Sequence, residues 1–166
     1  MQNLKWPILI VLSLIWGSSF ILMKRGLEAF SSEQVAALRI SMAYVFLLPF
    51  LIKHYKIDIK KYWKGLLGMG FFGNLIPAFL FTKAETGISS SLTGMLNALT
   101  PIFTVILGLF VFRNKTNLFQ FIGILTGFGG ALLLTYGDGD TKNAHINYAW
   151  FVVAATVCYA ISVNTI

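Results

Sequence analysis

Six long apolar stretches follow one another along this chain, and they constrain its fold more than any other feature. They cover residues 6–23, 35–52, 62–81, 88–112, 118–136 and 148–166. A bilayer core about 30 Å thick takes roughly 20 helical residues to cross, so each stretch can span a membrane. The runs are continuous rather than alternating, which favours helices over a barrel. We predict an all-α integral membrane protein, a polytopic bundle of six transmembrane helices embedded in a lipid bilayer.

Composition supports this prediction. Apolar residues make up 57 % of the 166-residue chain and charged residues only 11 %, whereas a soluble domain carries about 25 % charged residues. So few charges cannot cover a soluble surface, which excludes a cytosolic enzyme, a disordered tail and a nucleic-acid-binding domain. A cleaved signal peptide over residues 1–19 is the alternative for the first stretch. Five further stretches would still cross the membrane.

The basic residues predict the orientation. Four of them fall on one side of the predicted membrane: Lys24, Arg25, Lys83 and Lys142. The opposite side holds Lys5, Lys53, Lys56, Lys60, Lys61, Lys64, Arg113 and Lys115. The positive-inside rule therefore places the amino terminus in the cytoplasm, with the chain in the inner or plasma membrane. The lysines of residues 53–64 could also contact anionic lipid headgroups.

Two of the predicted spans contain helix-breaking residues together with polar side chains. Asn74 and Pro77 lie in the third span, and Asn97, Pro101 and Thr104 lie in the fourth. Proline frees a carbonyl one turn earlier, and in a bilayer that carbonyl must face protein or a water-filled cavity. Such breaks suit a solute pathway. The alternative is an ordinary proline kink, which is common in membrane helices.

Arg39 is the one formal charge well inside a predicted span. A charge at that position indicates a functional cavity or a structural pair, although its depth also allows it to snorkel to the interface. Trp16 and Ser19 add an aromatic ring and a hydroxyl in the first span. The candidates for lining a substrate pathway are therefore Trp16, Ser19, Arg39, Asn74, Pro77, Asn97, Pro101 and Thr104.

Small residues recur at helical spacing in the fourth and fifth spans. Gly94 lies in the fourth, and Gly123, Gly127 and Ala131 lie along one face of the fifth. Small residues let membrane helices approach closely. We predict that they pack helices within one bundle, and a dedicated dimer face is the alternative.

No catalytic or metal-binding pattern is present in the sequence. His54 and His145 are predicted on opposite sides of the membrane, and neither belongs to a ligand motif. The GDGD segment of residues 137–140 lacks the ligands of an EF-hand loop. We therefore predict no enzyme activity, no metal and no cofactor.

The sequence also resembles a known family. Four segments carry the resemblance to the EamA-type branch of the drug/metabolite transporter superfamily: WGSSFILMKRGL, ALRISMAYVFLLPF, LTGMLNALTPIFTVILGLFVF and QFIGILTGFGGALLL. The resemblance implies ten-helix carriers made of two five-helix repeats of opposite topology. Residues 1–136 would form the first repeat. Residues 137–166 would form the outer loop and the first helix of a truncated second repeat.

Two features depart from the family pattern. Asn114 stands where members often have a glutamate. The first span contains no acid, so the proton exchange of the small multidrug relatives cannot be carried over. We predict a secondary transporter, an exporter or permease for small organic metabolites or drugs, that works by alternating access. The alternative is a non-transporting fragment or a subunit of a membrane complex. The expected partners are a solute and either a second copy or the missing half-repeat.

Overall fold

The computed structural model describes residues 5–53, 59–113, 117–137 and 145–165, and this part of the chain is almost entirely helical. The helices, in chain order, are α1 (Lys5–Gly26), α2 (Ser32–Lys53), α3 (Ile59–Gly70), α4 (Ile76–Glu85), α5 (Ser90–Asn97), α6 (Thr100–Phe110), α7 (Leu118–Gly137) and α8 (Ile146–Asn164). One π-helical turn, η2 (Phe71–Leu75), joins α3 to α4.

Among the residues that the structure describes, five helical segments are long and apolar enough to cross a membrane. They are Lys5–Gly26, Ser32–Lys53, Lys61–Glu85, Ser90–Phe110 and Asn147–Asn164. In the described part of the chain, α7 contributes a shorter apolar stretch, Leu118–Gly130. The predicted all-α polytopic membrane bundle is confirmed. The third span, Lys61–Glu85, extends further than the predicted residues 62–81, since α4 continues past Phe81 to Glu85.

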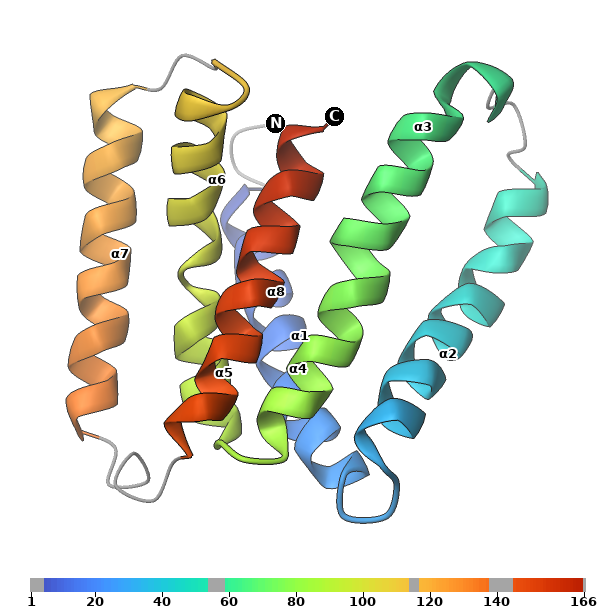
Figure 1. The fold of residues 1–166 in the computed structure, drawn as a ribbon, viewed down its shortest axis with the longest axis horizontal. Helices are drawn as coiled ribbons and strands as arrows, with labels where there is room; N and C mark the ends of the chain where they lie inside the picture. The colour runs from blue at the N-terminus through green and yellow to red at the C-terminus, as the bar shows by residue number, and fades with distance from the viewer. Residues whose placement is uncertain (1–4, 54–58, 114–116, 138–144, 166) are drawn as a thin grey trace.

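Helix α8 lies in the middle of the bundle (Figure 1). It packs against α3, η2, α4, α5 and α6. In the view of Figure 1, α7 and α2 form the two edges. Helices α1, α4 and α7 end where α2, α5 and α8 begin, at the bottom of Figure 1. We call this the lower end of the bundle. By the charge distribution it is the predicted outer side.

Side chains close the first turns of several helices. Ser31 Oγ accepts from Gln34 N at 3.3 Å, and Gln34 Oε1 accepts from Ser31 N at 2.9 Å. This reciprocal pair is a capping box that satisfies backbone donors at the start of α2. Ser89 plays a similar part for α5, where its side chain accepts from Leu92 N at 3.2 Å. The lower end of the bundle is therefore built from well-terminated helices.

The buried apolar core gathers where α1, α2, α4 and α8 meet. Its buried members are Met23, Val35, Phe81, Ala84, Ile88, Val152 and Ala155. Elsewhere large apolar side chains point outward, for example Phe46 on α2 and Phe119 on α7. Outward apolar surface of this extent suits lipid rather than water. The compact core therefore fixes the position of the lower half of the bundle.

Some features of the sequence lie outside the described residues. These are Lys56 and His54, residues 114–116, the acids of the GDGD segment, Lys142, and the side chain of Ala131.

Candidate functional site

A chain of hydrogen bonds crosses the break between α5 and α6 and continues onto α8. Thr100 Oγ1 donates to Asn97 Oδ1 at 3.2 Å, and Thr104 Oγ1 donates to Thr100 O at 2.8 Å. Asn164 of α8 donates from Nδ2 to Thr104 O at 3.0 Å. We call these four residues the polar ladder. It connects two of the predicted pathway residues, Asn97 and Thr104, with two residues that the sequence did not single out as candidates.

Pro101 accounts for the break. It has no N–H group, so it cannot close the helical hydrogen bond to the carbonyl of Asn97 four residues earlier. The chain turns more tightly instead, and Ala98 N donates to Met95 O at 3.0 Å. A carbonyl that its own helix does not use is the kind of group that can contact a solute or a neighbouring helix.

The second interruption lies in the α3–η2–α4 helix. The π-helical turn ends shortly before Pro77, which is buried in α4. Gly73 in this turn lies so close to α8 that a Cβ atom would overlap the Ser162 hydroxyl. Asn74 is exposed and takes no part in the polar ladder. Both interrupted helices therefore flank α8, but their amide side chains do not meet.

A second polar group lies toward the lower end of the bundle. Arg39 of α2 donates to Ser19 Oγ at 3.2 Å and to Met23 Sδ at 2.8 Å, both on α1. The structure thus brings together two more of the predicted residues, Ser19 and Arg39. Trp16 does not join them, because 65 % of its surface is exposed.

Lys24 and Glu85 complete this lower polar group. Lys24 Nζ donates to the backbone carbonyls of Glu85 at 2.5 Å and Ile88 at 3.0 Å. The ammonium group therefore stabilises the negative end of α4. The Glu85 side chain is fully buried. Lys24 and Arg39 act on its carboxylate electrostatically. We call Ser19, Lys24, Arg39 and Glu85 the charged cluster.

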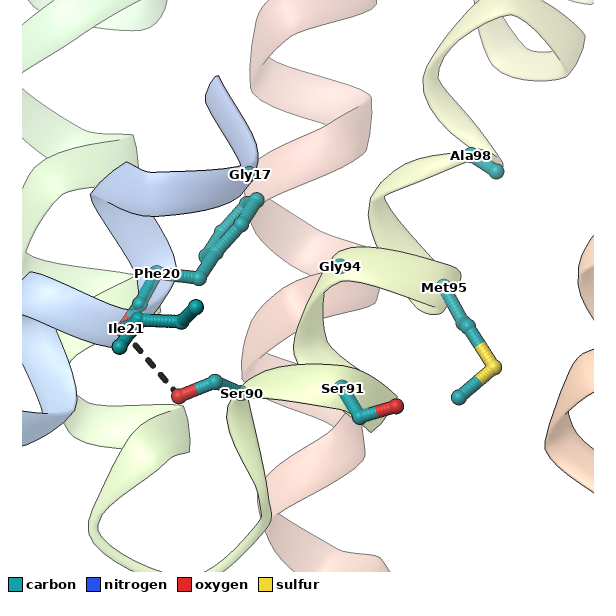
Figure 2. A pocket seen from close by; sticks show the side chains of 8 residues that line it. All are labelled: Gly17, Phe20, Ile21, Ser90, Ser91, Gly94, Met95 and Ala98. Atoms are coloured by element: carbon teal, nitrogen blue, oxygen red, sulfur yellow. Dashed lines mark hydrogen bonds between the residues drawn. The ribbon is translucent and has the colours of Figure 1, made fainter. Parts of the chain in front are cut away.

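An apolar groove runs between α1 and α5 (Figure 2). Its volume is about 470 Å³, and it is lined by Gly17, Phe20, Ile21, Ser90, Ser91, Gly94, Met95 and Ala98. Ser90 Oγ donates to Phe20 O at 3.2 Å across the groove. A Cβ atom on Gly94 would lie 3.7 Å from the Phe20 ring. Gly94 thus sits at the approach of α5 to α1.

The glycines of α7 have a different environment. No atom of another element lies within 4 Å of the position of a Cβ atom on Gly123 or Gly127. Their small-residue face is open in the described part of the chain. Their role in helix packing stays a prediction.

Sequence reasoning missed Glu85 and Asn164 as candidate residues. Glu85 was assigned to a polar link, yet Ala78, Phe81, Thr82 and Glu85 are all buried in α4. That spacing of three and four residues places Glu85 on the buried face of the helix, and it is visible in the sequence. Asn164 gave no comparable signal, because its partner lies 60 residues away.

The described residues contain no group of three His, Cys, Asp or Glu side chains that could hold a metal ion. The polar groups that the structure brings together are the hydroxyls and amides of the polar ladder and the residues of the charged cluster. Interrupted helices beside a central helix, with such groups, are typical of membrane carriers.

Comparison with known proteins identifies the family. The sequence model of the EamA-like transporter family matches residues 4–136, so the chain belongs to this family. The match ends before α8. No solved structure shows a significant match to this chain.

Several curated relatives are transporters by name. An uncharacterized transporter of Archaeoglobus fulgidus is 26 % identical over 95 % of this chain and 55 % of its own length. The uncharacterized inner membrane transporter YedA of Escherichia coli is 28 % identical over 81 % of this chain and 44 % of its own length. A probable amino-acid metabolite efflux pump of Salmonella typhimurium is 27 % identical over 88 % of this chain and 47 % of its own length. The chain spans about half the length of these relatives.

Proposed function

We propose that this chain moves small organic metabolites, of the amino-acid class, across the inner or plasma membrane by alternating access. The polar ladder carries this proposal. It includes hydroxyl and amide groups at a break inside a span that packs against the central helix. A solute crossing a bilayer needs hydrogen-bonding groups at that depth and helices that can bend there.

The relatives support the solute class and the membrane. The Salmonella relative and another from Escherichia coli are named as probable amino-acid metabolite efflux pumps. We infer export of such metabolites as the direction and propose that the amino terminus lies in the cytoplasm. We further propose that residues 1–136 form one five-helix repeat and that residues 137–166 begin a second. A second copy or a second half-repeat would complete the pathway.

An efflux assay tests this function. The 166-residue chain is produced in cells loaded with a mixture of radiolabelled amino acids, and release is compared with cells that lack the chain. Faster release is expected. Asn97→Leu should lower that release about tenfold or more, because the replacement removes the polar end of the ladder at the break.

The matched control is Asn147→Leu. Asn147 lies exposed in the first turn of α8, away from the ladder, so this variant should keep its activity. If correctly inserted chain releases no amino acid faster than the empty membrane, the proposed function is wrong. The alternative of a non-transporting fragment or subunit would then account for the chain.

A further inference from the structure

Glu85 carries a buried carboxylate without a hydrogen-bond partner. Its exposed fraction is 0 %. Neither Oε1 nor Oε2 accepts a hydrogen bond in the described part of the chain. The ion pair found among the described residues lies on the surface, between Arg25 and Glu28 at 3.6 Å, and does not include Glu85. Glu85 is thus an acid inside the bundle whose side chain the fold leaves unsatisfied.

The cations near Glu85 are engaged elsewhere. From α1, the Lys24 ammonium binds the backbone carbonyls of Glu85 and Ile88. From α2, the Arg39 guanidinium binds Ser19 and Met23. Both cations act on the carboxylate through space, but neither forms an ion pair with it.

Among the described residues, Lys24 and Arg39 are the charged groups that act on the carboxylate. From α5, the Ser90 hydroxyl lies next to it. From α8, two tyrosines pack near this end of α4: the Tyr159 ring lies 5.8 Å from the Phe81 ring between centroids, and the Tyr148 ring lies directly against Gly87. Lys83 on α4 is exposed. The described groups around Glu85 therefore include two cations that bind other partners, the Ser90 hydroxyl, two tyrosines and apolar side chains.

An ionised carboxylate without donors costs several kcal/mol in an apolar interior. A metal ion would need further ligands, and the described residues offer no group of three acids, histidines or cysteines. A proton needs no cavity and no further ligand. Protonation neutralises the carboxylate and removes the cost of burying an unpaired charge, so a proton is an occupant that this site can accept.

We propose that Glu85 is a proton-binding site that couples solute movement to a proton gradient. The coupling rests on the proposed function, although proton binding itself does not. One proton adds to the carboxylate from water on one side of the membrane, and the same proton leaves to water on the other. Ser90 links the site to the groove between α1 and α5, because it lines that groove and lies next to Glu85.

The contacts of Glu85 explain how its protonation could follow the conformation. The carboxyl group lies where α1, α2, α5 and α8 approach the end of α4. A shift of α1 against α4 would move Lys24 and change the balance between the bound and the released proton. Acids inside membrane spans commonly face the bundle interior and mark proton relays.

Labelling with dicyclohexylcarbodiimide tests the proton site without any transport. The reagent adds across the O–H group of a protonated carboxyl, whose proton passes to nitrogen, and leaves a stable acylurea. The full chain in phosphatidylcholine–phosphatidylglycerol vesicles is labelled at several pH values, and the modified residue is located by fragment mass spectrometry. Label is expected at Glu85, falling about tenfold per pH unit once the carboxyl ionises.

Glu28 is the internal control for labelling, since it is exposed and ion-paired with Arg25. It should take up little reagent at any pH at which Glu85 reacts. Absence of label at Glu85 across the whole pH range, or labelling at a level that pH does not change, would overturn the proton site. This result is read on the unsubstituted chain, so it does not depend on a variant that folds.

The coupling is tested in the same vesicles with trapped pyranine and an amino-acid mixture under a pH gradient. Glu85→Gln should abolish the dependence of amino-acid movement on the gradient, and Glu28→Gln should preserve it. Labelled Glu85 without any amino-acid movement leaves the proton site standing and contradicts the proposed function. Amino-acid movement whose gradient dependence survives Glu85→Gln contradicts the coupling and leaves the proposed function standing.

Discussion

Gly73 in the π-helical turn η2 lies directly against Ser162 of α8, with no room for a side chain between them. Replacement of Gly73 by alanine should therefore destabilise the bundle by about 1–3 kcal/mol, the usual effect of overpacking. Thermal unfolding of the detergent-solubilised chain measures the change. Gly70→Ala is the control, because no atom lies within 4 Å of its added Cβ. A second change, Ser162→Gly, should restore the stability of the Gly73→Ala chain.

Lys24 should stabilise the end of α4. Lys24→Met removes the donor to the carbonyls of Glu85 and Ile88, and we expect a loss of about 2 kcal/mol in unfolding free energy. Steric-trap unfolding in bicelles provides the measurement. Lys83→Met changes an exposed lysine of the same helix and should stay within about 0.5 kcal/mol. Equal losses in the two variants would refute the capping role.

Asn164 should hold α8 against α6. Asn164→Leu removes the donor to Thr104 O, and a loss of about 1 kcal/mol is expected, the scale of interhelical hydrogen bonds in membranes. The same unfolding measurement applies, with Asn147→Leu as the control on the same helix. An Asn164→Leu chain as stable as the control would show that the ladder ends at Thr104.

Thr104 should be reachable from water if the polar ladder lines a pathway. On a Cys158→Ser background, Thr104→Cys is expected to react with a membrane-impermeant maleimide in open vesicles. Leu125→Cys on α7 should not, because that side chain is exposed on a helix at the edge of the bundle, where lipid would cover it. Equal protection of both cysteines would contradict a water-filled pathway.

The orientation can be tested with the same reagent and background. His145→Cys lies just before α8 at the lower end of the bundle, and Lys53→Cys lies at the opposite end of α2. With the amino terminus in the cytoplasm, His145→Cys reacts in intact cells and Lys53→Cys reacts only after permeabilisation. The reverse pattern would invert the predicted topology.

The helix breaks could be predicted from the sequence because proline acts locally. Pro77 and Pro101 each remove a backbone donor wherever they stand in a helix, and both helices are interrupted near them. The partners of those breaks could not be predicted. Asn164 reaches Thr104 across 60 residues of sequence, and only the packing of α8 decides that contact. The small-residue face of α7 illustrates the same limit, because its spacing indicates close packing but does not say which helix packs there.

Glu85 lies between these two cases. The spacing of apolar residues in α4 already places it on the inner face, yet its position at the end of the apolar run suggested a polar link. The buried state follows from the cover that α1, α2 and α8 supply. Glu85 lies three and four residues beyond Thr82 and Phe81, which is the helical spacing that places it on their buried face.

The central position of α8 has a consequence for biogenesis. Chains emerge from the ribosome from the amino terminus onward, so α3, α4, α5 and α6 enter the membrane before the helix against which they pack. Before α8 is inserted, its contacts with Gly73, Thr104 and α4 cannot form. The helices made earlier are therefore not yet packed against a common partner. Insertion of residues 146–164 is then the step that brings α3, α4, α5 and α6 against a common helix. A ribosome stalled just before this segment would leave a membrane-inserted but uncompacted intermediate, exposed to quality-control proteases.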